Sequence, residues 1–133
     1  MKTYTINEVA QKFDLTAHTL RYYDKEGLLP FVTRTPAGKR IFSDHDLEWM
    51  KLICCLKDTG MPIKDIKQYS NWVRQGSESI ETRKAMLAAH REEVLKQIEA
   101  LHKNVDIIDA KIAFYENPEL RTHQHPSVAM EEV

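Results

Sequence analysis

The sequence of 133 residues contains only two cysteines and four glycines, and it has no long apolar run. No apolar stretch approaches the roughly 18 residues that a membrane-spanning helix requires. No charged segment followed by an apolar one marks the N-terminus as an export signal. We therefore expect a protein that is neither membrane-bound nor exported. Its two cysteines, Cys54 and Cys55, are adjacent and cannot readily form a strain-free disulfide with each other, so free thiols in a reducing cytoplasm are expected.

The sequence also lacks the patterns of common catalytic sites. It has no glycine-rich phosphate loop and no Ser-His-Asp set that a recognisable fold would bring together. It has no pair of carboxylates in an apolar pocket that would suggest acid–base catalysis. We therefore expect neither an enzyme nor a bound cofactor.

Net charge is close to zero, but it is unevenly distributed. The formal net charge is −1, which gives no general indication of a nucleic-acid partner. Residues 1–75 carry 12 Lys or Arg against 9 Asp or Glu, whereas residues 76–133 carry 7 against 11. The N-terminal part is therefore the basic one, which favours this part for contact with nucleic acid.

Two short helices joined by a tight turn are predicted at the N-terminus. Thr5 and Glu8 form a capping box that starts the first helix, and four apolar residues follow at helical spacing. Thr16 is a favourable N-cap for a second helix that runs to about Glu26, where Gly27 can adopt a left-handed conformation. This layout fits a helix-turn-helix. The four apolar residues are Ile6, Val9, Ala10 and Phe13.

The second helix presents polar and aromatic residues outward if Leu20 and Tyr23 face the first helix. Such residues can contact DNA, because arginine pairs with guanine or a phosphate, threonine meets base edges, and a tyrosine hydroxyl donates to phosphates. An amphipathic helix with a solvated face explains the pattern equally well. The outward residues are Ala17, His18, Thr19, Arg21 and Tyr22.

A basic hairpin predicted after these helices favours DNA binding. The segment holds Arg34, Lys39 and Arg40 and no acid. A Pro-Ala-Gly turn separates two β-capable runs, residues 31–33 and 40–42. A basic hairpin tip suits the phosphate backbone, so the segment predicts the wing of a winged helix-turn-helix.

Two further amphipathic helices are predicted after the hairpin. Ser43 and Asp46 resemble a capping box, and the helix that they start should end at Gly60. Pro62 is tolerated in the first turn of the next helix, and the globular domain should end near Gly76. The predicted inner residues are Trp49, Leu52, Ile53 and Leu56 in the first of these helices and Ile63, Ile66, Tyr69 or Ser70, and Val73 in the second.

A long helix of different period is predicted from about Ser79 to Tyr115. From Val94 onward its apolar residues alternate in spacing by four and three, as in the a and d positions of a coiled coil. At 1.5 Å per residue it would extend about 50 Å, too long for a domain of about 75 residues to cover. We expect a homodimer through residues 80–115, the alternative being a helix that folds back on its own domain. The predicted seam is Leu87, Val94, Ile98, Leu101, Val105, Ile108, Ile112 and Tyr115, with Arg91 as its one polar position.

The expected fold is mainly α-helical and has three regions. Residues 1–76 form the winged helix-turn-helix domain, and residues 77–117 form the hinge and the dimerisation helix. Asn117-Pro118 should stop that helix, and the polar, aperiodic segment 118–133 is expected to be a mobile tail.

Several short motifs occur together in one order. They are Thr5-Ile6-x-Glu8-Val9-Ala10, Thr19-Leu20-Arg21-Tyr22-Tyr23-Asp24, Gly27-Leu28-Leu29, Gly38-Lys39-Arg40, Asp46-Leu47, Ile53 and Leu56-Lys57-x-x-Gly60. In this order and spacing the sequence resembles the MerR family of bacterial transcription regulators over about residues 3–76. The resemblance implies a winged-helix domain, a linking helical pair and an antiparallel two-helix coiled-coil dimer.

The resemblance also implies a mechanism and partners. Such regulators bind an inverted-repeat operator in double-stranded DNA between promoter elements whose spacer is too long. When activated they kink and undertwist that DNA, so that RNA polymerase engages both elements. The implied role is therefore sequence-specific transcription regulation by distortion of promoter DNA.

Individual positions carry the implied DNA contacts. Arg21, Tyr22 and Tyr23 match recognition-helix residues that grip the backbone, Arg40 matches the wing arginine, and Lys57 matches a phosphate-contacting lysine. The wing of the family usually reads Gly-Tyr-Arg, whereas Lys39 replaces the tyrosine here. The full set of predicted DNA contacts is Thr16, His18, Thr19, Arg21, Tyr22, Tyr23, Arg34, Lys39, Arg40 and Lys57.

Cys55 is the expected effector-sensing residue. It matches the position of the single cysteine in the AdhR/NmlR-like subgroup of the family, which responds to aldehydes and related electrophiles. A thiolate attacks carbonyls readily, and Lys51, one turn earlier, could favour the ionised form. The alternative is a buried cysteine that only fills space and has a raised pKa.

Three other hypotheses compete with an electrophile sensor. Two adjacent thiols do not make a metal site, and the histidines His90, His102, His123 and His125 are weak ligand candidates, so no metal site is expected although a metal effector stays an alternative. A small noncovalent effector at the dimer interface is the second alternative. The third is a coiled-coil adaptor that binds proteins, which a salt-dependent, sequence-selective affinity for DNA would exclude.

Overall fold

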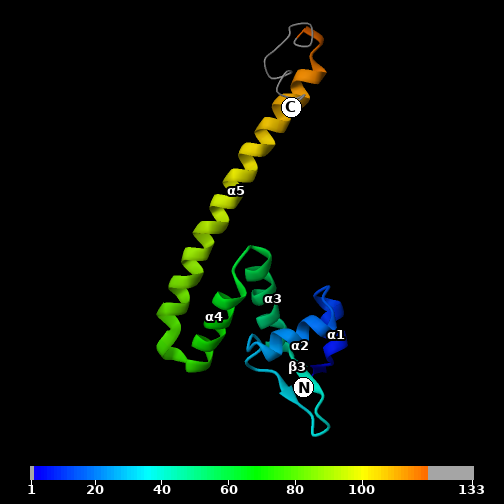
Figure 1. The fold of residues 1–133 in the computed structure, drawn as a ribbon, viewed down its shortest axis with the longest axis vertical. Coiled ribbons are helices and arrows are strands. Elements are labelled where there is room, and N and C mark those ends of the chain that lie inside the picture. Colours follow the sequence, from blue (N-terminus) through cyan, green and yellow to red (C-terminus); the bar gives the residue numbers. More distant parts are fainter. Residues whose placement is uncertain (1, 120–133) are drawn as a thin grey trace. The chain divides into compact units, whose positions relative to one another are not determined.

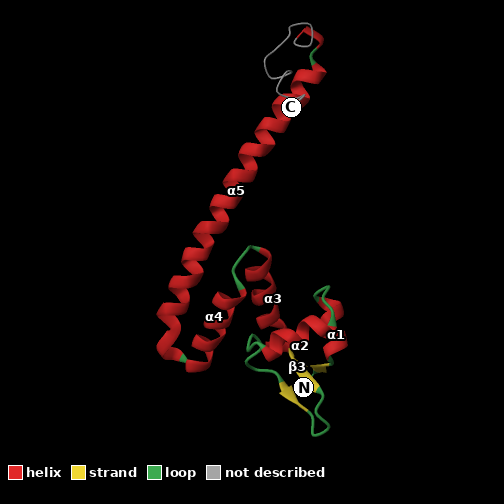
Figure 2. Ribbon diagram, in the orientation of Figure 1, coloured by secondary structure: helices red, strands yellow, loops and turns green. Residues whose placement is uncertain are grey.

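The computed structural model describes residues 2–119, and these are mainly helical (Figures 1 and 2). The elements are β1 (Thr3–Tyr4), α1 (Ile6–Lys12), α2 (Ala17–Lys25), β2 (Thr33–Arg34), β3 (Arg40–Ser43), α3 (Asp44–Asp58), α4 (Ile63–Gln75), the 3-10 turn η1 (Ser77–Ser79) and α5 (Ile80–Glu116). One compact unit ends at His90 and a second begins at Arg91. The predicted fold class, a winged helix-turn-helix followed by a long helix, is confirmed.

The predicted starts of α1 and α3 are confirmed, since each helix begins with the expected capping box. Thr5 Oγ1 accepts from the Glu8 amide at 3.2 Å, and Glu8 Oε1 accepts from the Thr5 amide at 2.9 Å. The same reciprocal pair joins Ser43 and Asp46, at 3.2 and 2.8 Å. Each box satisfies amides that have no partner within the helix. In consequence α1 and α3 begin one residue after their caps.

The three strands form a small antiparallel sheet in the order β1-β3-β2. Thr3 lies opposite Ser43, and Arg34 lies opposite Arg40. The strand β1 was not predicted, because two residues are too short to show a period of two. It adds a third strand to the sheet, so the start of the chain pairs with β3 of the wing.

The predicted first strand of the hairpin, residues 31–33, is wrong by two residues. The ring of Phe31 lies edge-on to His45 at 4.7 Å and to Trp49 at 5.9 Å between ring centroids. This packing holds Phe31 outside the sheet, so β2 starts only at Thr33. The second strand extends one residue further than predicted, to Ser43.

The core of the first unit draws on α1 to α4, on β3 and on the loops after α2 and α3. In α3 the buried line runs through Met50, Ile53 and Leu56, whereas Trp49, predicted as an inner residue, is only partly buried. Its indole Nε1 donates to the Leu28 carbonyl at 2.6 Å, which places the ring at the edge of the core. The buried apolar cluster is Val9, Ala10, Leu20, Tyr23, Leu28, Leu29, Phe42, Met50, Ile53, Leu56, Met61 and Ile66.

The first turns of α5 belong to the N-terminal unit. Met86 and Leu87 pack against its core, so Leu87, predicted at the start of the seam, contacts its own domain. At the preceding bend Arg83 donates to Ser79 Oγ at 3.0 Å and to the Gly76 carbonyl at 2.9 Å. These contacts extend the unit beyond the point where its compact part was expected to end.

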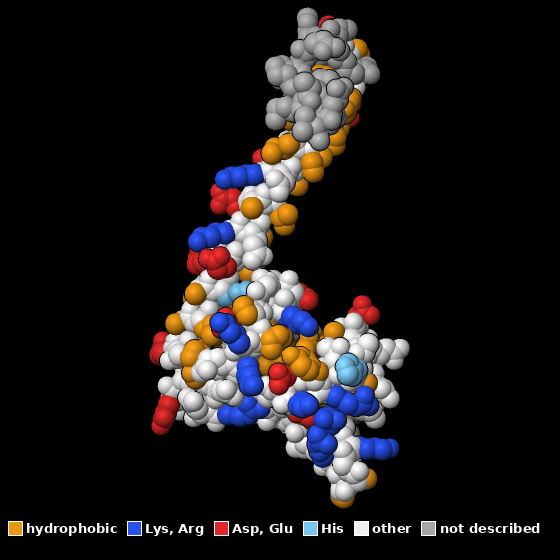
Figure 3. Space-filling view, in the orientation of Figure 1, with side chains coloured by type: hydrophobic (Ala, Val, Ile, Leu, Met, Phe, Trp, Pro, Cys, Tyr) orange, Lys and Arg blue, Asp and Glu red, His pale blue; other side chains and the backbone are white. Residues whose placement is uncertain are grey.

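The second unit contains the rest of α5, whose apolar side chains are exposed. From Leu95 to Tyr115 seven large apolar residues have exposed fractions between 41% and 64%, and Ile107 reaches 69%. Figure 3 shows hydrophobic side chains along this part of the helix. The helix ends at Glu116, directly before Asn117-Pro118, as predicted. The rest of the predicted tail, from residue 120, lies outside the described residues.

No helix within residues 2–119 is both long and apolar enough to cross a membrane.

Candidate nucleic-acid interface

The start of α2 is held by two threonines. Thr16 Oγ1 accepts from the Thr19 amide at 3.0 Å and lies 2.9 Å from Thr19 Oγ1. The predicted N-cap is therefore confirmed, and both hydroxyls take part in it. His18, Arg21 and Tyr22 follow on the exposed face of the helix, as the sequence predicted.

Tyr23 connects the core to a surface lysine. Its ring is buried, with an exposed fraction of 1%, and its hydroxyl accepts a hydrogen bond from Lys57 Nζ at 2.7 Å. The Lys57 ammonium also lies 5.0 Å from the centre of the ring. The hydrogen bond to Tyr23 raises the pKa of Lys57 above its usual value. Tyr23 can therefore offer DNA only its hydroxyl, and that hydroxyl fixes the position of a cation.

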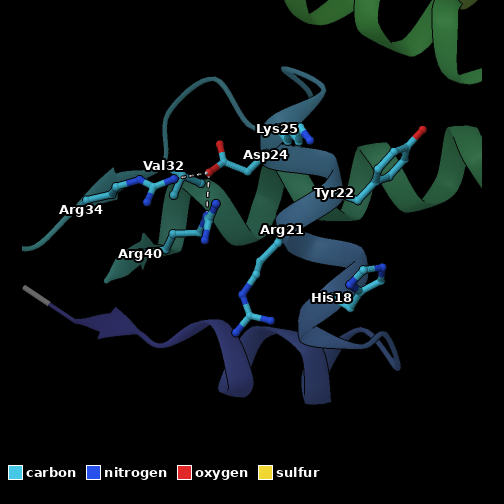
Figure 4. A pocket seen from close by; sticks show the side chains of 8 residues that line it. All are labelled: His18, Arg21, Tyr22, Asp24, Lys25, Val32, Arg34 and Arg40. Atoms are coloured by element: carbon cyan, nitrogen blue, oxygen red, sulfur yellow. Dashed lines mark hydrogen bonds and ion pairs between the residues drawn. The ribbon is translucent and has the colours of Figure 1, made fainter. Parts of the chain in front are cut away.

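Wing and recognition helix meet at one carboxylate. Asp24 Oδ2 accepts from Arg40 Nε at 2.7 Å and lies 3.6 Å from Arg34 NH2 (Figure 4). Arg34 also donates to the Gly38 carbonyl at 3.4 Å. Both wing arginines that the sequence singled out thus converge on the last turn of α2.

The turn of the wing has open surroundings. Gly38 has a φ of +88°, which L side chains rarely adopt, and nothing lies within 4 Å of where its Cβ would be. The Lys39 amide donates to Thr35 Oγ1 at 3.1 Å, and the Lys39 side chain is exposed. The backbone of the turn is therefore hydrogen-bonded, and the Lys39 ammonium is exposed to solvent.

A pocket of about 550 Å³ lies between α2 and the wing. Four of its lining residues are arginine or lysine and one is an acid, so its surface is strongly basic. Five of the predicted DNA contacts line this pocket. The pocket is not lined by the other five, which are Thr16, Thr19, Tyr23, Lys39 and Lys57. Its lining residues are His18, Arg21, Tyr22, Asp24, Lys25, Val32, Arg34 and Arg40.

The two cysteines of α3 differ in exposure. Cys55 is exposed, and Cys54 is half-buried. Burial, together with the nearby Asp58 carboxylate, raises the pKa of the Cys54 thiol. The Lys51 ammonium, which the sequence suggested as an activating cation, lies 3.0 Å from Glu48. Of the two thiols, that of Cys55 is the one open to a solute.

A chain of hydrogen bonds leads from α3 to α5. Thr59 Oγ1 donates to the Cys55 carbonyl at 2.7 Å and lies 2.7 Å from His90 Nε2. Because the single hydroxyl hydrogen is directed to the carbonyl, we assign the hydrogen of the second contact to Nε2. The backbone of Cys55 is therefore two hydrogen bonds from the helix that leaves the domain.

Within residues 2–119 no group of three or more His, Cys, Asp or Glu side chains is arranged to hold a metal ion. His123 and His125, the weak candidates in the tail, lie outside the described residues.

Sequence reasoning missed two residues of this region. Asp24 ends the Thr19–Asp24 motif, and its one sequence signal is that it is an acid close to basic residues. Thr59 has no such signal, because its partner His90 lies 31 residues away.

Comparison with known families decides what kind of protein carries this interface. A sequence model described as MerR HTH family regulatory protein matches residues 4–71, and one described as MerR, DNA binding matches residues 47–113. The chain belongs to the MerR family. It is a DNA-binding transcription regulator of that family, not an enzyme.

Two relatives of this MerR regulator are HTH-type transcriptional regulators of other bacteria. An uncharacterised HTH-type transcriptional regulator of Haemophilus influenzae is 44% identical over 86% of this chain and 84% of its own length. AdhR of Bacillus subtilis is 36% identical over 68% of this chain and 65% of its own. These similarities agree with the predicted AdhR/NmlR-like subgroup.

A solved structure is also similar to this MerR regulator. The crystal structure of HiNmlR, described as a MerR family regulator lacking the sensor domain, shows that protein bound to promoter DNA. It superposes with a TM-score of 0.81 at 43% identity, over 86% of this chain and 91% of the other.

Proposed function

We propose that this MerR regulator binds an inverted-repeat operator as a homodimer, distorts the promoter DNA and responds to electrophiles through Cys55. The observation that supports the DNA contacts best is the basic pocket between α2 and the wing. Arg21 and Tyr22 are exposed and line this pocket, and their side chains leave α2 in different directions (Figure 4). HiNmlR, which shares the fold, was crystallised on promoter DNA.

The proposed contacts divide by element. Residues His18, Arg21 and Tyr22 of α2 would meet base edges and phosphates, because a recognition helix enters the major groove. Arg34 and Lys39 of the wing would meet the flanking backbone. Thr16 and Thr19 would fix the helix start, and Tyr23 would position the Lys57 ammonium for a phosphate. Arg40 would offer the guanidinium nitrogens that Asp24 does not use.

The homodimer is supported by the exposed stripe of the second unit. Ile98, Leu101, Val105 and Ile108 each expose 48% or more, which is costly for large apolar side chains in water. Their alternating spacing suits a second copy of the same helix. Two copies would give two recognition helices, and a protein with twofold symmetry matches an inverted repeat.

Distortion of the promoter is proposed from the dimer rather than from single contacts. A dimer holds two recognition helices at a fixed spacing, so DNA that engages both must conform to that spacing. Undertwisting would then bring two misaligned promoter elements onto one face for RNA polymerase. A small change in the linking helices would alter this spacing and switch transcription.

The proposed sensing step is a reversible addition. The Cys55 thiolate sulfur attacks the carbonyl carbon of an aldehyde and forms a C–S bond. The electron pair of the carbonyl π bond moves to oxygen, which takes a proton from water, giving a hemithioacetal. The adduct lies on α3 one turn before Thr59, whose hydroxyl connects the Cys55 carbonyl to His90 of α5.

The DNA contacts are tested by Arg21→Ala. We expect loss of at least about 100-fold in operator affinity, since an exposed arginine at the centre of the interface carries both charge and hydrogen bonds. Fluorescence anisotropy with a labelled operator and excess nonspecific DNA measures it. The exposed Lys84→Ala on α5 removes the same charge away from the pocket and should change affinity less than threefold. Equal effects of the two variants would contradict the proposed interface.

The sensing role is tested with a reporter gene driven by the operator. Formaldehyde or methylglyoxal should induce the reporter with the natural chain and not with Cys55→Ser at equal protein level. Cys54→Ser is the matched control and should leave induction intact, because the Cys54 thiol is half-buried with a raised pKa. Operator binding without effector should be the same for all three proteins. Equal induction in Cys55→Ser would refute the proposal.

A further inference from the structure

Asp24 is the one acid among the residues that line the basic pocket. Its carboxylate would face the phosphates of bound DNA, and a negative charge there repels them. By its charge alone, Asp24 would weaken DNA binding. Its contacts with Arg40 and Arg34 point instead to a role that strengthens DNA binding.

The carboxylate joins the end of α2 to both strands of the wing. Asp24 lies in the last turn of α2, Arg40 starts β3, and Arg34 ends β2. Both arginines reach the same oxygen, Oδ2, and Arg34 continues to the Gly38 carbonyl in the wing turn. One side chain therefore contacts both strands of the wing, and through Arg34 its turn (Figure 4).

The base of the wing is held by β1, which pairs with β3, and by the buried Phe42, whereas its outer part, residues 33–40, reaches α2 through the two arginines. The pairing of β2 with β3 extends over two residue pairs, Thr33 with Ile41 and Arg34 with Arg40. This outer part is a two-stranded ribbon, which alone is marginally stable in water, so its direction depends on tertiary contacts. The side chains of Arg40 and Asp24 are only 16% and 20% exposed, whereas Arg34 is 53% exposed. The Arg40 contact is the better shielded of the two and therefore the stronger tether.

We propose that Asp24 is a positioning residue that fixes the wing relative to the recognition helix by holding Arg40 and Arg34. This inference rests on the proposed DNA contacts of α2 and the wing. It assigns Arg40 a double role, with Nε bound to Asp24 and the terminal nitrogens aimed at a phosphate. The negative charge of Asp24 thereby favours DNA binding, although it repels DNA directly.

The two effects of Asp24 have opposite signs, so a charge-neutralising substitution separates them. Asp24→Asn keeps the shape of the side chain and removes its charge. If positioning dominates, operator affinity falls by about tenfold, as for a close charge pair that loses one partner. The slope of log affinity against log salt should also become shallower by about one to two, because fewer phosphates are contacted. If Asp24 is only a surface acid, affinity rises and the slope does not fall.

The matched control is Glu26→Gln, two residues further along. It makes the same change in charge, and the Glu26 side chain forms no hydrogen bond or ion pair within the described part of the chain. We expect its operator affinity to be unchanged or slightly higher. The conservative variant Asp24→Glu keeps the charge and should restore most of the affinity that Asp24→Asn loses.

Hydroxyl-radical footprinting of the full chain on its operator locates the change. At saturating Asp24→Asn the protection from the wing should be lost at the outer end of each half-site, while protection from α2 persists. Retention of the α2 footprint shows that the variant is folded, and Asp24→Ser is measured by the same criteria if Asp24→Asn does not fold. An unchanged wing footprint with equal or tighter binding would overturn the proposal.

Operator binding by Arg21→Ala and Asp24→Asn separates the positioning role of Asp24 from the DNA interface itself. If Arg21→Ala binds as tightly as the natural chain, the interface itself is wrong. If Arg21→Ala fails to bind and Asp24→Asn binds normally, the interface stands and the positioning role falls.

Discussion

At the scale of single residues, Tyr23 joins the core to Lys57, a cation that we propose contacts DNA. Its ring is part of the core, and its hydroxyl accepts from Lys57 Nζ. We predict that Tyr23→Phe lowers the free energy of unfolding by no more than about 1 kcal/mol at pH 7, because the ring is kept and the lysine is exposed and screened. Denaturant unfolding followed by tryptophan fluorescence measures this difference.

The pH dependence of the Tyr23 effect follows from the raised pKa of Lys57. A group whose pKa is higher in the folded state stabilises that state fully below its unfolded pKa, about 10.4 for lysine. This contribution is lost as the pH rises through the folded value. The natural chain and Tyr23→Phe should therefore differ by a constant amount from pH 6 to 9 and converge at more alkaline pH. A difference that grows above about pH 10.5 would contradict the assignment.

The interactions that could be predicted from the sequence are those between residues a few positions apart. Thr5 with Glu8, and Ser43 with Asp46, lie three residues apart, and so both capping boxes could be predicted. The role of Asp24 could not be predicted, because its partner Arg40 is 16 residues away and reaches it only when the wing folds back. The exposure of Cys55 was equally open, since a one-residue rotation of α3 would have exchanged it with Cys54.

At the scale of elements, the helices and the hairpin of the wing were predicted, whereas β1 and the bounds of β2 were not. Helix periodicity extends over two or more turns, whereas β1 and β2 have two residues each and exist only because β3 pairs with both. In α3 the burial of Ile53 and Leu56 was predicted, but Met50 is buried where Trp49 was expected. Trp49 looked like a core residue by type, but its indole donor needed the Leu28 carbonyl at the core edge.

The link between α3 and α5 yields a prediction about signalling. Thr59→Val keeps the branched shape but removes the hydroxyl that connects the Cys55 carbonyl to His90. We expect the free energy of unfolding to fall by about 1 kcal/mol and electrophile induction to fall several-fold, with operator binding retained. Reporter induction and urea unfolding measure the two effects. The control Thr82→Val lies exposed in the first turn of α5 and should behave as the natural chain. Full induction by Thr59→Val would show that the signal takes another route.

At the scale of the whole molecule, the second unit adds a helix with exposed apolar side chains, which we propose pairs two chains. The N-terminal unit has its own core, its caps and its basic pocket. The helix beyond Arg91 has no buried residue within the described chain and exposes a stripe of large apolar side chains. A helix of this kind is stable in solution when its apolar face is covered. In the proposed dimer the second copy would cover this face, stabilise α5 and permit tight operator binding.

Two adjacent isoleucines test the dimer seam. Ile108 lies in the predicted seam and Ile107 lies beside it, and both are exposed in the single chain, at 58% and 69%. Ile108→Asp would bury a charge between the two helices, so we predict a monomer by analytical ultracentrifugation and a loss of operator affinity of at least about 100-fold, since the two half-sites are then bound independently. Ile107→Asp adds the same charge off the seam and should leave a dimer with normal affinity. If Ile107→Asp dissociates the dimer and Ile108→Asp does not, the helices pair through a face rotated from the predicted one. If neither does, α5 is not the interface.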